Sequence, residues 1–203
     1  MTNIKDPLIS EADKNPFIQF DKWFKEHIIS ESRTPNSVSL GTASLDGRVS
    51  LRTVLLKEYN ESGFVFYTNY KSKKSIQLMS NHKAALLFYW PESGRQIRIE
   101  GITERISDKE SESYFKTRPR ESQLSAWASE QSSVIPHREY LEKRYQLYKN
   151  KFLNKPVKKP PYWGGFRLIP GWVEFWQNGE LRLHDRLTYT KRKNIWVIDR
   201  LAP

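Results

Sequence analysis

The stretch SVSLGTASLDGRVSLRTVLLK, residues 37–57, indicates the fold class of this chain. Its middle holds the dipeptide Asp46-Gly47, which is typical of a two-residue hairpin turn. The arms on both sides are rich in β-branched residues and leucine, as strands are. The stretch therefore predicts that residues 37–45 pair antiparallel with residues 48–57.

The rest of the chain adds short strands, and its helices are grouped rather than alternating with them. Strands are predicted over residues 63–69, 83–91, 95–107, 162–170, 171–177, 181–190 and 194–201. Helices are predicted over 15–29 with Asn15 as cap, over 72–81 with Ser72 as cap, and within 108–150 with breaks at Pro119 and 129–136. This order predicts a mainly β fold with helical additions. We expect an antiparallel barrel in a single domain, residues 15–203, behind a flexible N-terminal segment, 1–14.

The composition argues against several kinds of site. The 203 residues contain no cysteine, which excludes disulfides, thiolate nucleophiles and cysteine-based zinc sites. The four histidines do not stand at helical ligand spacings, so we expect no metal site. The sequence shows neither a signal peptide nor an apolar run of membrane-spanning length, and we expect a soluble cytoplasmic protein.

The formal net charge of +11, from 34 basic and 23 acidic residues, calls for anionic partners. Nucleic acid is one such partner. However, the basic residues are interleaved with acidic ones, and the densest basic run, residues 154–161, is proline-rich and resembles a connector. Small phosphorylated ligands form the other class. Charge alone does not decide between them.

The segment ELRLHDRL, residues 180–187, alternates apolar and charged side chains. In an extended strand Arg182, His184 and Arg186 share one face, and the intervening leucines anchor the strand from behind. Two interpretations are open at this point. The strand either presents a solvated basic face or lines a ligand site.

Two further segments carry paired cations. In SLRTVLLK, residues 50–57, alternation places Arg52 and Lys57 on opposite faces, as rim residues or as ligand contacts. In YTNYKSKKS, residues 67–75, Lys73 and Lys74 lie in the first turn of a predicted helix, where cations oppose the helix dipole. An anion at this helix start removes the conflict, so an anion site is the favoured interpretation.

A third candidate is YFKTRPRESQLSAW, residues 114–127. Tyr114 and Arg118 lie one helical turn apart, Pro119 then breaks the helix, and Ser122 follows. Hydroxyl and guanidinium groups that converge at such a break can form a phosphate cradle. Taken alone, however, the segment is better explained as an ordinary solvated turn.

Together these motifs resemble the pyridoxine/pyridoxamine 5'-phosphate oxidase family. The resemblance runs from about Asn15 to Pro203 and is carried by RTVLLK, FVFYTN, TRPRESQ, AWASEQSS, WGGFR, VEFWQNGELRLHDR and DRLAP. It implies an FMN-binding split barrel. It also implies a homodimer whose active sites lie at the subunit interface and draw residues from both chains.

The resemblance also implies the cofactor, the substrates and the site. The cofactor is FMN, and the substrates are phosphorylated B6 vitamers and O2. The FMN positions are Arg52, Thr53, Val54, Leu55, Leu56, Lys57, Tyr67, Thr68, Lys73, Lys74, Gln96, Gln131, Ser132, Trp176 and Arg186. The substrate positions are Lys57, Tyr114, Arg118 and Ser122 for the phosphate, with Arg182 and His184 beside the pyridine ring as the catalytic positions.

The implied reaction is oxidation of pyridoxine 5'-phosphate or pyridoxamine 5'-phosphate to pyridoxal 5'-phosphate, with H2O2 as product. The alternatives are another flavin-dependent reductase of this barrel class and a basic nucleic-acid-binding barrel without activity. Two departures from the family pattern stand out. Lys73 replaces an arginine that family members generally carry, and so loses a planar fork. The residues before Asn15 lack the basic and aromatic side chains that some members fold over the substrate.

Overall fold

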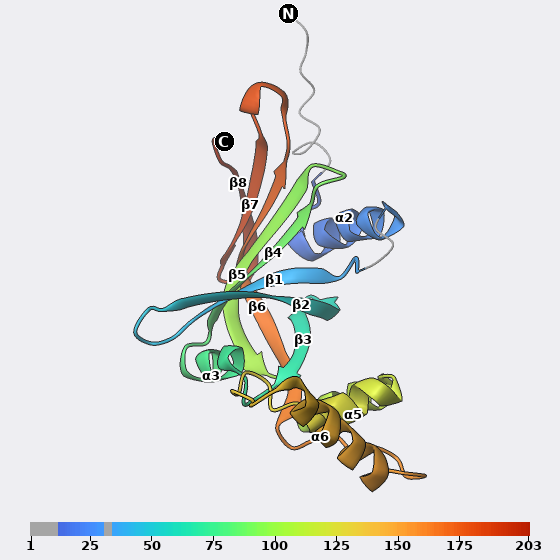
Figure 1. Ribbon diagram of the computed structural model, residues 1–203. Coiled ribbons are helices and arrows are strands. Elements are labelled where there is room, and N and C mark those ends of the chain that lie inside the picture. Colours follow the sequence, from blue (N-terminus) through green and yellow to red (C-terminus); the bar gives the residue numbers. More distant parts are fainter. Residues whose placement is uncertain (1–11, 31–33) are drawn as a thin grey trace, which may run out of the picture.

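The computed structural model describes residues 12–30 and 34–203. In this part of the chain six antiparallel strands close into a barrel in the order β3-β2-β1-β4-β5-β6, because β6 pairs back onto β3. Two further strands, β7 and β8, continue the sheet beyond β6 (Figure 1). The predicted antiparallel β-barrel with helical additions is therefore confirmed. The strands are β1 (Ser37–Ala43), β2 (Val49–Asn60), β3 (Gly63–Asn69), β4 (Lys83–Trp90), β5 (Arg95–Arg105), β6 (Trp163–Gln177), β7 (Asp185–Arg192) and β8 (Ile195–Arg200).

The β1–β2 hairpin has the predicted antiparallel pairing but a longer turn. Beyond the paired strands, the Ser44 N–H donates to the Arg48 carbonyl at 3.1 Å, so the loop consists of residues 45–47. Gly47 has a φ of 82°, the left-handed conformation that closes three-residue hairpin loops. The predicted two-residue turn is thus one residue too short.

Strand β6 is a single strand of 15 residues, where the sequence predicted two strands over 162–170 and 171–177. Its first half pairs with β3 as far as Leu168, and its second half pairs with β7 from Trp172 onwards. Pro170 lies where this partner changes, and on the other side it faces a register shift between Glu100 and Gly101 of β5, the kind of irregularity at which a strand tolerates proline. The strand therefore leaves the barrel without ending and carries the β7–β8 extension.

Helix α2 (Pro16–Ser30) packs against the barrel strands and contributes to a core rich in aromatic rings. The Asn15 side chain caps it as predicted, because its Oδ1 accepts a hydrogen bond from the Phe17 N–H at 2.9 Å. Ile28, four residues after the buried Phe24, is 44% exposed, whereas Trp23 is buried. The other apolar side chains that α2 buries are Phe17, Phe20 and Phe24.

The remaining described α-helices are α3 (Lys73–Ser80), α4 (Asp108–Thr117), α5 (Arg120–Ala128) and α6 (Arg138–Lys151). Pro119 separates α4 from α5 as predicted, although the helix resumes at once rather than after a turn. Ser72 occupies the N-cap position of α3, but its hydroxyl contacts Ser75 and Lys74 instead of capping the backbone. Helices α5 and α6 lie at the end of the barrel away from the β7–β8 extension (Figure 1). No helix in the described ranges is long and apolar enough to cross a membrane.

Most of the predicted flexible segment, residues 1–14, lies outside the described residues, which begin at Ala12. The last part of this segment contacts the domain. The Tyr189 hydroxyl donates to the Asp13 carbonyl at 2.7 Å, and the Asp13 N–H donates to Gln19 Oε1 at 3.1 Å. These contacts attach the chain to β7 and α2 two residues before Asn15.

Candidate functional site

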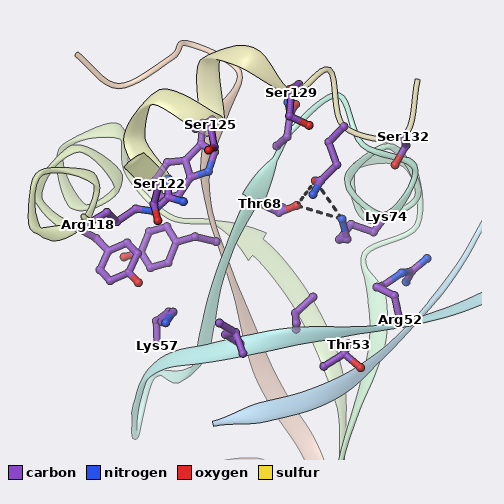
Figure 2. A pocket seen from close by; sticks show the side chains of 18 of the residues that line it. Arg52, Thr53, Lys57, Thr68, Lys74, Arg118, Ser122, Ser125, Ser129 and Ser132 are labelled. Carbon is purple, nitrogen blue, oxygen red and sulfur yellow. Dashed lines mark hydrogen bonds between the residues drawn. The ribbon is translucent and has the colours of Figure 1, made fainter. Parts of the chain in front are cut away.

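A cavity of about 820 Å³ lies between β2, the start of α3 and the α4–α5 region (Figure 2). Five basic side chains line it, and none of its lining residues carries a carboxylate. Arg52 and Lys74 form one basic end, next to Lys73 in the first turn of α3, and Lys57 and Arg118 form the other. The predicted site residues in this cavity, called the cavity group below, are Arg52, Thr53, Val54, Leu55, Lys57, Tyr67, Thr68, Lys73, Lys74, Tyr114, Arg118, Ser122, Gln131 and Ser132.

Lys74 is buried in the first turn of α3, and only neutral groups hold its ammonium group. Nζ donates to Thr68 Oγ1 at 3.2 Å, Ser72 Oγ at 3.3 Å and Gln131 Oε1 at 3.2 Å. Burial, and to a lesser extent the nearby charge of Arg52, lowers the pKa of Lys74 from 10.5 to about 8. A bound anion would stabilise the charged form, which this environment otherwise disfavours.

Arg52 reaches the same end of the cavity from β2. Its Nη1 donates to Thr42 Oγ1 at 2.6 Å and to the Leu40 carbonyl at 3.2 Å. Neither contact carries a negative charge, and burial lowers the pKa of Arg52. Arg52 and Lys74 thus place two cations at one end of the cavity, and no described carboxylate forms an ion pair with either. This arrangement is typical of a site for a phosphate or another multiply charged anion.

Arg118, which follows α4, provides the opposite end of the cavity. Its guanidinium carbon lies 4.7 Å from the centroid of the Trp163 ring. Its Nη1 is buried and has no hydrogen-bond partner among the described residues, and burial lowers its pKa. A buried charged donor without an acceptor is costly unless a ligand provides one. Ser122 and Lys57 face the same end (Figure 2).

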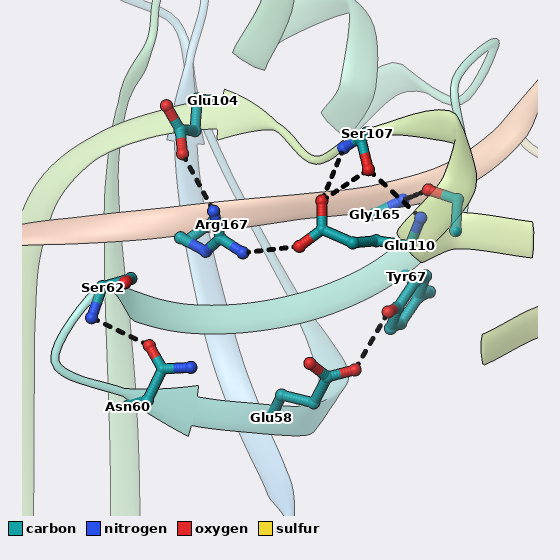
Figure 3. Close-up of polar contacts among 10 residues, drawn as sticks. Glu58, Asn60, Ser62, Tyr67, Glu104, Ser107, Glu110, Gly165 and Arg167 are labelled. Carbon is teal, nitrogen blue, oxygen red and sulfur yellow. Dashed lines mark hydrogen bonds and ion pairs between the residues drawn. The ribbon is translucent and has the colours of Figure 1, made fainter. Parts of the chain in front are cut away.

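Helix α4 is anchored to the barrel by a polar network at its start (Figure 3). Ser107 and Glu110 form a capping box, in which each side chain accepts a hydrogen bond from the backbone N–H of the other. The second oxygen of Glu110 accepts from Arg167 of β6 at 3.0 Å. Because α4 is short, anchoring its first turn also places its last turn, which carries Tyr114 and precedes Arg118.

Three aromatic rings form one wall of the cavity. The Tyr67 ring stacks on Tyr114 with centroids 4.0 Å apart and on Trp163 with centroids 5.3 Å apart. The Tyr67 hydroxyl donates to Glu58 Oε1 at 3.1 Å. Burial, together with the negative charge of Glu58, raises the pKa of Tyr67 well above its usual value. The phenol therefore stays neutral, and the wall adds no negative charge.

Six predicted residues lie outside the cavity, and all of them except Leu56 lie on or next to the β5–β6–β7 part of the sheet. Gln96, Trp176 and Arg186 are neighbours across β5, β6 and β7. The His184 ring lies 4.7 Å from the Trp176 ring, and its Nδ1 accepts from the Gly179 N–H at 3.2 Å. In the neutral imidazole this leaves Nε2 as the N–H donor. The set, called the β7 group below, consists of Gln96, Trp176, Arg182, His184 and Arg186.

The prediction of a strand over residues 181–190 is wrong at its start. Residues 180–182 form a 3-10 turn in which Leu181 and Arg182 have positive φ values of 54° and 64°. Strand β7 begins only at Asp185. The partner strand β6 ends at Gln177, directly opposite Asp185, so the preceding residues have no strand with which to pair.

This turn also changes which side chains are buried. Leu181 and Leu183, predicted to anchor the strand, are 89% and 69% exposed, and only Leu187 is buried. Arg182 and His184 therefore do not share a strand face with Arg186. A turn places them, and the contact with Trp176 orients the imidazole.

The cavity group and the β7 group are far apart in one chain. Trp163 lines the cavity at the start of β6, and Trp176 lies near the end of the same strand. At about 3.3 Å per residue, roughly 40 Å of strand separates them. Leu56 is excluded from the cavity for a different reason, because its side chain is buried in the barrel core.

Several cavity residues were not predicted. Ser125 and Ser129 line the cavity three and seven residues after Ser122, a helical spacing that signals one shared face. Trp163 belongs to the WGGFR motif, but nothing in the sequence indicates that its ring supports Arg118. The other unpredicted lining residues are Asn69, Thr117, Pro119 and Ala126.

Family models match most of the chain. Residues 24–151 match the family described as pyridoxamine 5'-phosphate oxidase. Residues 163–203 match the family described as pyridoxine 5'-phosphate oxidase C-terminal dimerisation region. A pyridoxine/pyridoxamine 5'-phosphate oxidase from Nostoc punctiforme is 50% identical over 194 residues, which cover 95% of this chain and 91% of that protein. One from Rubrobacter xylanophilus is 50% identical over 192 residues, covering 95% of this chain and 88% of that protein.

Two solved structures extend the comparison. PhzG from Burkholderia lata, solved in complex with tetrahydrophenazine-1-carboxylic acid, matches with a TM-score of 0.92 and 29% identity. The match covers 99% of this chain and 98% of PhzG. A pyridoxamine 5'-phosphate oxidase-related, FMN-binding protein from Nostoc punctiforme matches with a TM-score of 0.74 and 18% identity, over 95% of this chain and 100% of that protein. The second likeness supports the fold alone.

Proposed function

The chain belongs to the pyridoxamine 5'-phosphate oxidase family, and from this premise we propose that it is an FMN-dependent oxidase of phosphorylated B6 vitamers. It oxidises pyridoxine 5'-phosphate and pyridoxamine 5'-phosphate to pyridoxal 5'-phosphate. The observation that carries this proposal is the cavity with two basic ends and no carboxylate in its lining. FMN and the substrate each bring one phosphate, so two phosphates match two basic ends.

The Lys74 end of the cavity fits the phosphate of FMN. Lys74 and Arg52 are cations without an acidic partner among the described residues, and the start of α3 adds backbone N–H groups. A phosphate placed there offsets the repulsion between the two cations and supplies the missing charge. We assign this phosphate to Arg52, Lys73, Lys74, Gln131 and Ser132. Lys73 is exposed and would contribute a point charge rather than a bidentate contact.

Strand β2 would hold the rest of the cofactor. The cavity is lined by Thr53, Val54 and Leu55, which lie between Arg52 and Lys57 along β2. Tyr67 and Thr68 line it from the neighbouring strand β3. These positions offer mainly apolar surface and backbone polar groups, which suit a flat heteroaromatic ring. Leu56 would contribute through the backbone or through packing of the core beneath the site, since its side chain is buried.

The Arg118 end fits the phosphate of the substrate. The unpartnered Nη1 of Arg118 would gain an acceptor, and Lys57, Tyr114 and Ser122 would add a cation and two hydroxyls. Trp163 holds the guanidinium from behind by a cation–π contact. The anchoring of α4 by Glu110 supports this end, because it positions Tyr114 before any ligand arrives.

A second copy of the chain would bring the β7 group to the cavity group. The C-terminal region of the chain matches a dimerisation region, which indicates a homodimer. The β7 group lies within that region except for Gln96, and it does not line the cavity of its own chain. We propose that each active site combines the cavity group of one subunit with the β7 group of the other.

The chemistry divides between cofactor and protein. Bound FMN supplies the two-electron acceptor for oxidation at the C4' carbon of the substrate, and we propose O2 as the final acceptor, which yields H2O2. Arg182 carries a guanidinium group, which donates hydrogen bonds and cannot accept them, so its role is to orient the substrate and to stabilise negative charge. His184, with Nε2 as donor in the neutral ring, is assigned to a hydrogen bond with a ring substituent.

The direct test uses the purified protein. We expect it to bind FMN with a flavin absorption band, and to form pyridoxal 5'-phosphate and H2O2 from both phosphorylated vitamers. The dephosphorylated vitamers should be poor substrates, because the Arg118 end is built for an anion. Failure to bind FMN, or equal turnover of the dephosphorylated vitamers, contradicts the proposal. The same assay is repeated with tetrahydrophenazine-1-carboxylic acid, the ligand in the PhzG structure, in place of the vitamers.

A further inference from the structure

We propose that Thr42 and Gln77 are positioning residues that aim Arg52 at the phosphate of FMN. Neither residue lines the cavity, and both are buried, with exposures of 3% and 6%. Thr42 belongs to β1 and Gln77 to α3, so neither sits on the strand that carries Arg52. The inference rests on the proposed function, because it presumes that FMN is the anion at this end.

The three side chains form a continuous chain of hydrogen bonds. Arg52 Nη1 donates to Thr42 Oγ1 at 2.6 Å, and Thr42 Oγ1 donates to Gln77 Oε1 at 2.6 Å. Gln77 Nε2 then donates to the Arg48 carbonyl and to Ser50 Oγ, both at 3.3 Å. This series of hydrogen bonds therefore starts and ends on the β1–β2 hairpin and passes through α3.

Each bond in this chain can run in one direction only. The guanidinium of Arg52 has no acceptor, so the Thr42 oxygen must accept there and must give its single proton to Gln77. Gln77 must then present its carbonyl to Thr42 and its amide N–H2 to the Arg48 carbonyl, which cannot donate. With no alternative pattern of protons, the chain holds the arginine in one orientation.

This chain of hydrogen bonds counteracts the electrostatic repulsion between Arg52 and Lys74. Arg52 contributes to the lowered pKa of Lys74, so the two cations interact unfavourably before an anion binds. An arginine on a long side chain would relieve this by turning towards water. Thr42 holds Nη1 in place, and Gln77 links the same unit to α3, the helix that carries Lys73 and Lys74. Both halves of the phosphate site are thereby preorganised, which reduces the cost of binding.

The test compares FMN with riboflavin, which lacks the phosphate, by titrating each into the flavin-free protein. Thr42→Val keeps the shape of the side chain and removes the hydroxyl. We expect it to raise the Kd for FMN about tenfold, as loss of one well-aligned charged contact does, and to leave the Kd for riboflavin within about twofold. Thr42→Ser restores the hydroxyl and should bind FMN like the wild type. Gln77→Met removes the acceptor of Thr42 and should weaken FMN binding in the same selective way.

A double-mutant cycle identifies the route of the effect. In an Arg52→Leu background, Thr42→Val should cause no further loss of FMN affinity, because the group it positions is gone. Thr103→Val is the matched control, since Thr103 is a buried threonine on β5 whose hydroxyl donates to the His82 carbonyl away from the cavity. It should leave the Kd for FMN unchanged.

The outcomes separate this inference from the proposed function. If the wild type binds no FMN, the proposed function fails. If the wild type and Arg52→Leu differ in FMN affinity but Thr42→Val and Gln77→Met bind like the wild type, the positioning role is wrong. Equal losses for FMN and riboflavin, or an additive loss in the Arg52→Leu background, also overturn it, since they indicate a general packing defect.

Discussion

Glu174 Oε1 accepts a 2.6 Å hydrogen bond from Nε of Arg186, and the Glu174 side chain is almost completely buried. Its other oxygen accepts from Arg98 Nη1 at 2.9 Å. Arg186 also donates through Nη1 to the Ala202 carbonyl near the end of the chain, at 2.8 Å. One buried carboxylate thus holds two guanidinium groups, of which Arg186 is assigned to FMN.

We expect Glu174→Gln to lower the free energy of unfolding by about 2 kcal/mol. This is less than the 3–5 kcal/mol of a fully buried pair, because Arg98 and Arg186 remain partly exposed. Urea denaturation measures the change. Glu100→Gln is the control, because Glu100 pairs with the same Arg98 at 2.8 Å on the surface and should cost less than about 1 kcal/mol. Equal effects of the two substitutions would show that burial of Glu174 does not matter.

The affinity for FMN should depend on pH through Lys74. Because burial lowers its pKa to about 8 in the flavin-free protein, Lys74 is charged below that pH and neutral above it. Binding of FMN above pH 8 must take up a proton, so affinity should be full below pH 8 and fall by up to about tenfold per pH unit above it. Fluorescence titration from pH 7 to pH 9 measures this fall.

Lys74→Met is the matching variant. It should bind FMN about 10 to 100 times more weakly at pH 7, as expected for a lost charge-assisted contact, and show no fall in affinity between pH 7 and pH 9. A wild-type affinity that does not change over this range, or a variant with the same pH profile as the wild type, contradicts the assignment of Lys74.

Arg118→Leu should lower kcat/KM for pyridoxine 5'-phosphate about 10- to 100-fold, mainly through KM, and leave the Kd for FMN unchanged. The variant should be at least as stable as the wild type, because the buried Nη1 has no hydrogen-bond partner in residues 12–30 and 34–203. Arg120→Leu is the contrast. Arg120 donates to the Phe152 and Lys155 carbonyls, so its loss should reduce stability and not KM. Steady-state kinetics of both variants measures the change in KM, and thermal unfolding measures the change in stability.

Gly164→Ala should destabilise the fold by about 2 kcal/mol, in the range for overpacking a core. A Cβ at this position would lie 2.1 Å from Tyr70 Oη and 2.8 Å from Ser111 Oγ. Gly171→Ala, in the same strand, is the control, because nothing lies within 4 Å of its Cβ. Urea midpoints of the two variants give the comparison. A midpoint for Gly164→Ala equal to that of the control would mean that the neighbouring groups move aside freely.

Mixed dimers test whether two chains share each site. Lys74→Met removes a member of the cavity group, and His184→Ala removes a member of the β7 group. At an FMN concentration that saturates the wild type but lies well below the Kd of Lys74→Met, each homodimer should be nearly inactive. If each site uses both chains, a mixed dimer has one intact site and one doubly defective site. Random reassociation of equal amounts should then restore about a quarter of wild-type activity, since half of the dimers are mixed. No recovery after verified subunit exchange refutes the shared site.

Local sequence patterns correctly predicted several turns, caps and helix breaks. The hairpin at Asp46-Gly47, the cap at Asn15 and the break at Pro119 all appear where expected, apart from one residue in the hairpin loop. These features depend on contacts within a few residues. The placement of Lys73 and Lys74 at a helix start was likewise visible, because a cation there conflicts with the helix dipole.

The segment before Asp185 shows where local patterns stop being informative. Alternation of apolar and charged residues predicts a strand only if a neighbouring strand is present, and β6 ends opposite Asp185. The continuous β6 is the converse case, since two strands were predicted over 162–170 and 171–177, but β5 pairs with both halves and joins them into one strand. In both cases the deciding hydrogen-bond partners lie in other strands.

The sequence by itself determined the barrel class, the family and all five basic residues that line the cavity, because these depend on local spacing and motif order. Only the tertiary structure decided which of the predicted residues lie close together. It separated the cavity group from the β7 group along β6, placed the guanidinium of Arg118 over Trp163 with its Nη1 lacking a hydrogen-bond partner in the described part of the chain, and tied Arg52 to Gln77 through Thr42. The physical reason is that these relationships are contacts between distant segments, whose distances and burial are set by strand pairing and packing rather than by neighbours in the chain.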